Sequence, residues 1–145
     1  MSKEFLNVNK AKKSLEKVFE EWNLSIDIAE WQKGFVVKSA INQKYYGNIG
    51  LDVFVSPSGL VSFYLYFGIL KKNGQTLELV NEFNENVVGL KASIDCDNGM
   101  LTVSHETQYV TENTIGSYAE SVLLSIVNNI TLKYLQPLNE LTVKD

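Results

Sequence analysis

Two residue types that often take part in catalysis occur once each in this chain, and they lie close together in the sequence. Cys96 and His105 are the only cysteine and the only histidine, and both fall in the stretch SIDCDNGMLTVSHE, residues 93–106. A thiol and an imidazole can act as nucleophile and general base if they come within about 2.6–3.2 Å of each other. Whether they can do so depends on the elements that carry them.

The dipeptide Asn98-Gly99 separates two strand-like runs and is the strongest short signal for a β-hairpin. In the register of a two-residue loop, Cys96 and His105 share a face but lie four residues apart along the ladder, about 13 Å at ~3.3 Å per residue. We therefore expect no catalytic dyad. Cys96 is predicted to be a small buried hydrophobic residue, and His105 a half-buried strand residue with a local hydrogen bond. The predicted pairs are Ala92 with His105, Ile94 with Val103, and Cys96 with Leu101.

Other site chemistries lack the residues that they need. One cysteine and one histidine are too few for a recognisable zinc site. Asp95 and Asp97 resemble the start of a calcium loop, but the glycine and glutamate that should follow are missing. The nine glycines are scattered, and none forms a phosphate-binding loop. The sequence thus predicts no catalytic residue, no metal ligand and no cofactor.

The composition is that of an ordinary globular protein. With 145 residues, 45% of them hydrophobic and 21% charged, the chain is expected to fold as one domain over residues 1–145. The net charge of -4 disfavours nucleic acid and anionic membrane surfaces as partners. The polar stretch MSKEFLNVNKAKK has no apolar segment typical of a secretory signal, and the longest apolar run is too short to cross a membrane. We therefore expect a cytoplasmic protein.

The spacing of apolar residues predicts an α+β fold with the order α-β-β-β-α-β-β-α and a single antiparallel sheet of about five strands. Trp31 and Gly34 are placed in a connection, Thr76 is a candidate helix cap, and Gly89 is a candidate helix terminator. Helices are expected over residues 9–22, 76–87 and from about 115 to 135, and strands over residues 35–42, 48–56, 60–70, 90–96 and 100–109.

The register of the central hairpin follows from its hydrophobic pattern, since a slip of one residue would move every side chain to the other face. A three-residue loop at Pro57-Ser58-Gly59 pairs Val55 with Val61, Val53 with Phe63, and Leu51 with Leu65 on the core face. The opposite face then carries Asp52, Ser62 and the three aromatic residues Phe54, Tyr64 and Tyr66. That face is more aromatic than a solvated sheet face needs to be.

The stretch LVNEFNENVVGLKASIDCDNGMLTVSHETQYVTENTIG, residues 79–116, resembles the YbjN-like proteins, a family described as bacterial sensory transduction regulators. The resemblance lies in a helix with the pattern Val80-Asn81-x-Phe83-Asn84, a strand, an acidic turn with glycine, a second strand, and a loop into a long helix. It implies a type III secretion chaperone-like fold, often dimeric, that binds proteins without catalysis. Asn81 and Asn84 can be interpreted as capping or strand-bonding residues or as ligand contacts.

Together these observations predict a non-enzymatic, chaperone-like or regulatory protein. Phe54, Tyr64 and Tyr66 are the predicted protein-binding residues, because aromatic side chains with a polar tip are favoured at recognition surfaces. A second copy of the chain or a client segment would cover them; alternatively, the chain's own loop Glu30–Gly34, with Trp31, folds over them. An enzyme of unrecognised type and a dedicated immunity or structural partner of one protein remain as alternative functions.

Overall fold

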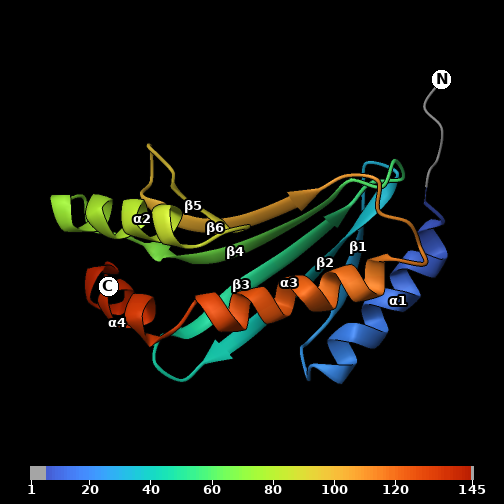
Figure 1. Cartoon of the computed structure of the whole chain (residues 1–145), viewed down its shortest axis with the longest axis horizontal. Helices are drawn as coiled ribbons and strands as arrows, with labels where there is room; N and C mark the ends of the chain where they lie inside the picture. Colours follow the sequence, from blue (N-terminus) through green and yellow to red (C-terminus); the bar gives the residue numbers. More distant parts are fainter. Residues whose placement is uncertain (1–5, 145) are drawn as a thin grey trace.

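The computed structural model describes residues 6–144. These residues form one antiparallel sheet of six strands, in the order β1-β2-β3-β4-β6-β5, and four helices (Figure 1). The start of the chain, where the sequence predicts no secretory signal, lies partly outside the described residues. The elements are α1 (Val8–Glu21), β1 (Asp27–Trp31), β2 (Gly34–Gln43), β3 (Gly47–Val55), β4 (Val61–Ile69), α2 (Gly74–Asn86), β5 (Lys91–Ile94), β6 (Met100–Thr107), α3 (Ile115–Asn129) and α4 (Leu132–Leu141).

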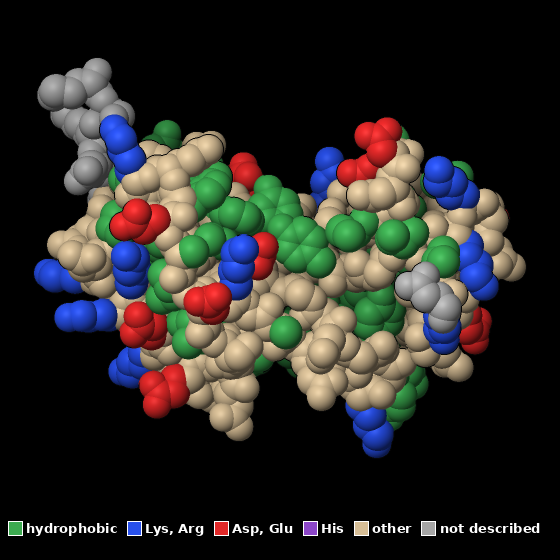
Figure 2. Space-filling view, turned by 180° about the vertical axis from the view of Figure 1, so that it is seen from behind, with side chains coloured by type: hydrophobic (Ala, Val, Ile, Leu, Met, Phe, Trp, Pro, Cys, Tyr) green, Lys and Arg blue, Asp and Glu red, His purple; other side chains and the backbone are tan. Residues whose placement is uncertain are grey.

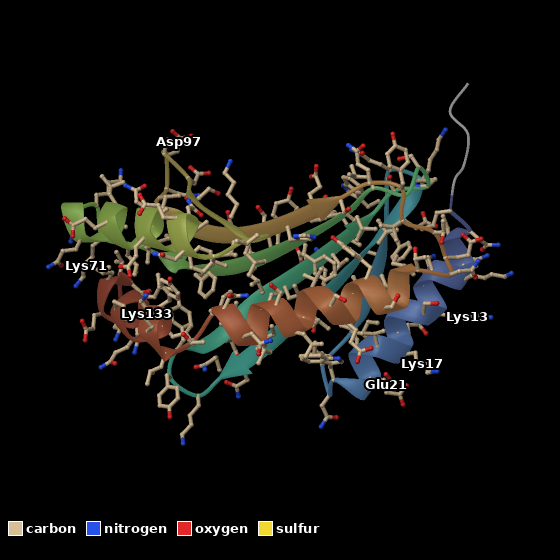
Figure 3. The ribbon with its side chains drawn as sticks, viewed as in Figure 1. Lys13, Lys17, Glu21, Lys71, Asp97 and Lys133 are labelled. Atoms are coloured by element: carbon tan, nitrogen blue, oxygen red, sulfur yellow. The ribbon has the colours of Figure 1, made fainter. Side chains whose placement is uncertain are left out.

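All four helices pack on the same face of the sheet. Apolar side chains of α1 and α3 are buried over the half formed by β2, β3 and β4, and Tyr118 of α3 meets Phe63 of β4 edge-on. Helices α2 and α4 cover the other half, where Phe83 and Tyr134 pack over Ala92 and Val103. The charged residues of α1 lie on its solvated side, as the alternating charges indicate; Lys13, Lys17 and Glu21 point away from the sheet (Figure 3).

The predicted register of the central hairpin is confirmed. Val55 pairs with Val61, Val53 with Phe63, and Leu51 with Leu65, and all six side chains are buried. The expected α+β class with a single antiparallel sheet is likewise observed, although with two more elements than predicted.

The first additional element is β1, which includes Trp31, a residue predicted to lie in a connection. Gln32 and Lys33 both adopt positive φ angles, 44° and 68°, and form the tight turn that pairs Trp31 with Gly34. Such turns usually carry asparagine or glycine, so this hairpin has no sequence signal.

The second additional element is α4. The predicted helix to Leu135 is interrupted at Ile130 and Thr131, and the backbone of Thr131 is extended. The apolar pattern hides this break because Ile130, Tyr134 and Leu135 are all buried. Pro137, expected beyond the end of the helix, lies inside α4.

Helix α2 begins and ends with different groups from those expected. Asn73 caps it by accepting a hydrogen bond from the backbone N–H of Thr76, while the Thr76 hydroxyl donates to the carbonyl of Lys71. Thr76 is therefore not the cap. Gly89 does have the positive φ of a terminating glycine, 87°.

The predicted register of the second hairpin is wrong by two residues. Ala92 pairs with Val103 and Ile94 with Leu101, because the loop is longer than two residues. The Asp95 carboxylate accepts hydrogen bonds from the backbone N–H groups of Asp97 and Asn98 and so stabilises the wider loop. A shift of two residues keeps the same side chains on the core face, so the apolar pattern could not detect it.

This wider loop changes the environment of Cys96 but not that of His105. Cys96 lies in the loop with its thiol exposed, next to Asp97 at the tip of the hairpin (Figure 3), so the predicted buried position is wrong. His105 is half-buried, as expected, and its Nδ1 hydrogen-bonds to the backbone carbonyl of Gly89. The two residues lie on different elements and form no dyad.

The free edge of β5 is closed by a side chain of α2. The Asn84 amide donates to the carbonyl of Ala92 at 2.9 Å, and the Ala92 N–H donates to Asn84 Oδ1 at 2.8 Å. One side chain thereby replaces the neighbouring strand that an edge would otherwise recruit. The interpretation of Asn84 as a strand-bonding residue is confirmed.

We expect Asn84→Ala to lower the free energy of unfolding by about 1–3 kcal/mol, because it leaves two backbone groups of Ala92 without a partner. Asn81→Ala is the matched control. It lies on the same helix, and its exposed side chain makes no hydrogen bond within residues 6–144, so its effect should stay within about 0.5 kcal/mol. Urea unfolding of the two variants measures the difference, and equal effects would refute this role of Asn84.

We expect the thiol of Cys96 to react with a soluble thiol reagent in the folded protein, because it is exposed at the hairpin tip. Cys96→Ala should change the free energy of unfolding by no more than about 0.5 kcal/mol. The check is to compare the labelling rate with and without denaturant. A thiol that reacts only after unfolding would contradict the wider loop.

Candidate protein-binding face

The side of the sheet opposite the four helices is here called the outer face, and no helix of residues 6–144 packs on it (Figure 1). In Figure 1, α3 lies in front of β3, so the reverse view looks onto the side of the sheet away from α3. Seen from there, hydrophobic side chains form a band across the upper middle of the surface, and most charged side chains lie toward the two ends (Figure 2). The sequence predicts the composition of this face from the period of two along each strand.

Four aromatic side chains lie side by side on the outer face. Trp31 of β1 meets Phe54 of β3 edge-on, with ring centroids 4.9 Å apart, and Phe54 meets Tyr64 of β4 in the same way at 5.7 Å. Tyr64 and Tyr66 follow with nearly parallel rings, 6.3 Å apart and inclined by 20°. All four side chains are half-buried. The structure therefore brings the three predicted residues together and adds Trp31. These four residues are called the aromatic row.

The sequence predicts that Trp31 lies in a loop that could cover the outer face. It lies instead at the end of β1, and its ring packs against that of Phe54. Tyr64 and Tyr66 lie farther along the row. The chain's own covering of the outer face thus reaches one of the three predicted residues and leaves the two tyrosines with their rings half-exposed.

A line of polar and charged residues crosses the outer face beside the aromatic row. Successive cross-strand partners form this line from β1 to β5: Asp27, Lys38, Asp52, Tyr64, Ser104 and Lys91. Asp52 is half-buried, whereas Lys38 is exposed. The face as a whole is therefore mixed in charge, with a carboxylate directly beside the two tyrosines.

The Tyr66 side chain lies diagonally across β3 and β4 from Asp52, since Asp52 pairs with Tyr64 and Gly50 pairs with Tyr66. Its ring leans over Gly50, where an added Cβ would lie 3.5 Å from the ring, so the glycine gives the tyrosine a flat surface. Burial raises the pKa of Tyr66 from 10.0 to about 12, and the negative charge of Asp52 acts in the same direction.

A cavity of about 20 Å³, lined by apolar residues, lies between α2, α4 and the sheet, and it is hardly larger than a water molecule. Within the described residues, no group of three or more His, Cys, Asp or Glu side chains is placed to hold a metal ion. No helix in residues 6–144 is both long and apolar enough to cross a membrane.

Comparison with known proteins gives a result for the fold alone. No protein-family model matches the sequence, and no curated protein matches it. The structure is similar to the crystal structure of YbjN from E. coli, described as a candidate transcription regulator, with a TM-score of 0.61 and 16% sequence identity. The match covers 97% of this chain and 99% of that one. This chain has the fold of YbjN.

A second solved structure found in the comparison is the Yersinia pestis type III secretion chaperone SycH in complex with a stable fragment of YscM2. It matches with a TM-score of 0.45 and 13% identity, over 82% of this chain and 98% of that one. The structural match to YbjN confirms, at the level of the fold, the resemblance to YbjN-like proteins noted in residues 79–116.

We expect the stability of the protein to fall between pH 10 and pH 12 through Tyr66. Its pKa is about 12 in the folded chain, above its ordinary value of 10.0, so the unfolded chain loses this proton first as the pH rises. The contribution is complete below pH 10 and lost as the pH passes through 12. Tyr66→Phe should make the curve of unfolding free energy against pH shallower in this range, and Asp52→Asn should do so in part. Urea unfolding at a series of pH values tests this, and an unchanged slope in Tyr66→Phe would rule it out.

Proposed function

We propose that this chain is a non-enzymatic, cytoplasmic protein of regulatory or chaperone-like type that binds another protein through its outer face. The observation that carries the proposal is the aromatic row of Trp31, Phe54, Tyr64 and Tyr66, on the sheet face opposite the four helices. Aromatic side chains bring a large contact area with few rotors to immobilise, and they are enriched where proteins bind each other.

The covered edge at β5 favours the outer face over that edge of the sheet as the surface for partners. Asn84 occupies the backbone groups of Ala92, so a strand cannot be added there. The two tyrosines of the outer face stay partly exposed. A covered β5 edge beside a partly exposed aromatic face favours side-chain recognition over strand addition at that edge.

The cytoplasm as the place of action is supported by Cys96. A single exposed thiol suits a reducing compartment, because it would otherwise be open to pairing with other thiols. The YbjN fold, associated with a protein described as a candidate regulator, agrees with a regulatory role.

Three alternatives predict different observations: binding of another protein, catalysis, and binding of a second copy of the chain. A partner protein from the native host should be recovered with the folded chain in a pull-down, and mass spectrometry identifies it. An enzyme would instead require a pocket with several convergent polar groups. A homodimer through the outer face would change the mass of the protein in solution.

We expect Tyr64→Glu with Tyr66→Glu to weaken binding of the recovered partner by at least about tenfold, because two carboxylates replace the rings at the centre of the face. Tyr45→Glu is the matched control, since Tyr45 is 51% exposed in the β2–β3 turn, away from the outer face. Isothermal titration measures the affinity, and light scattering measures the mass.

The double variant must still unfold cooperatively for this comparison to count, which a thermal melt shows. Unchanged affinity and mass in a cooperatively unfolding double variant would remove the outer face as the interface. An equal loss in Tyr45→Glu would indicate a general effect of added charge.

A further inference from the structure

The outer face places a carboxylate directly against aromatic rings. Asp52 is the cross-strand partner of Tyr64 and lies diagonally across the same two strands from Tyr66. The rings of Tyr64 and Tyr66 stand nearly parallel beside it, 6.3 Å apart. A half-buried anion next to exposed ring faces has the chemistry of a cation site, because both the carboxylate and the π faces attract positive charge.

The shape of the site favours a planar cation. A guanidinium can stack on a tyrosine ring and at the same time donate two parallel hydrogen bonds to one carboxylate, whereas an ammonium is a compact point charge. Gly50 keeps the neighbouring position on β3 low, so that only the ring of Tyr66 rises above the sheet there.

The guanidinium must come from another protein. All 13 basic residues of this chain are lysines, so a second copy has no arginine to offer. The exposed apolar area is also small. At 150–250 Å² for each aromatic side chain, four half-buried rings expose roughly 300 Å², against about 800 Å² for each partner of a stable protein complex. An area of this size fits a short segment of chain, not a dimer interface.

One residue opposes the binding of a cation, and it makes the site testable. Lys38 is the cross-strand partner of Asp52 on the other side. It is exposed, and no ion pair joins it to Asp52 within residues 6–144. The positive charge of Lys38 would repel an incoming guanidinium and so weaken its binding by a modest amount.

We propose that the outer face binds an extended protein segment through an arginine, whose guanidinium stacks on Tyr64 and Tyr66 and pairs with the carboxylate of Asp52. This inference rests on the proposed function, since it names the partner chemistry for the same face. It requires Asp52 for charge and geometry, the two tyrosines for stacking, and no contribution from a second copy.

The test uses the full chain and three short peptides of alternating serine and valine that differ only in the central residue. The centre is arginine, citrulline or glutamate, and citrulline keeps the shape of arginine without its charge. Titrations followed by ¹H–¹⁵N and aromatic ¹H–¹³C NMR locate and measure binding. We expect the arginine peptide to shift signals of Phe54, Tyr64 and Tyr66 and to bind at least about tenfold more tightly than the citrulline peptide.

Variants then separate the contributions. Asp52→Asn should weaken binding of the arginine peptide at least about tenfold and leave that of the citrulline peptide nearly unchanged, whereas Lys38→Gln should strengthen binding of the arginine peptide a few-fold. Glu120→Gln on α3 is the matched control for loss of one negative charge, and it should have no such effect. Cooperative thermal unfolding of each variant shows that the fold is retained.

Three results would overturn the inference. Equal binding of the arginine and citrulline peptides at the outer face would leave the proposed function standing but remove the arginine. The arginine peptide could also cause no NMR shifts on the outer face. If Tyr64→Glu with Tyr66→Glu still abolishes binding of the recovered partner, that result removes only the arginine. If the double variant leaves partner binding intact, the result counts against both proposals. A concentration-dependent dimer that the double variant abolishes would make a second copy the occupant.

Discussion

The burial of apolar side chains from β3 and β4 under the helices is the constraint on which the rest of the structure depends. Val53, Phe63 and Leu65 are almost completely buried, and a register shifted by one residue would no longer put all of them on one face. Because the side chains of a strand alternate, the same register fixes what stands on the outer face. Asp52, Tyr64 and Tyr66 are neighbours there as a consequence of how the core packs.

How far the fold can be predicted from the sequence depends on what each signal measures. The period of two identified the central hairpin and its register, since a slip would expose the core. It could not distinguish the two registers of the β5–β6 hairpin, because a shift of two residues leaves Ala92, Ile94, Leu101 and Val103 on the same face. That register is set by the carboxylate of Asp95, whose hydrogen bonds in the loop leave no mark on the hydrophobic pattern.

The candidate site was predictable to the same degree. Phe54, Tyr64 and Tyr66 follow from strand alternation, but Trp31 does not, because Gln32 and Lys33 lack the residue types that usually announce a tight turn. The contact between Asp52 and Tyr66 joins positions that are diagonal across two strands, and no spacing rule in the sequence points to it. Long-range pairs of this kind become visible only when the strands are placed side by side.

The order of the strands has a consequence for how the protein acquires its shape. Strands β1 to β4 pair in the order in which they occur along the chain, from Asp27 to Ile69, so their contacts close short loops. Helix α3, which packs against α1, comes about a hundred residues after it, and closing such a long loop is slow. The strands that carry the aromatic row are thus complete in a growing polypeptide before the helix that shields their opposite face has been made. During synthesis, the surface on the outer face exists earlier than the finished core.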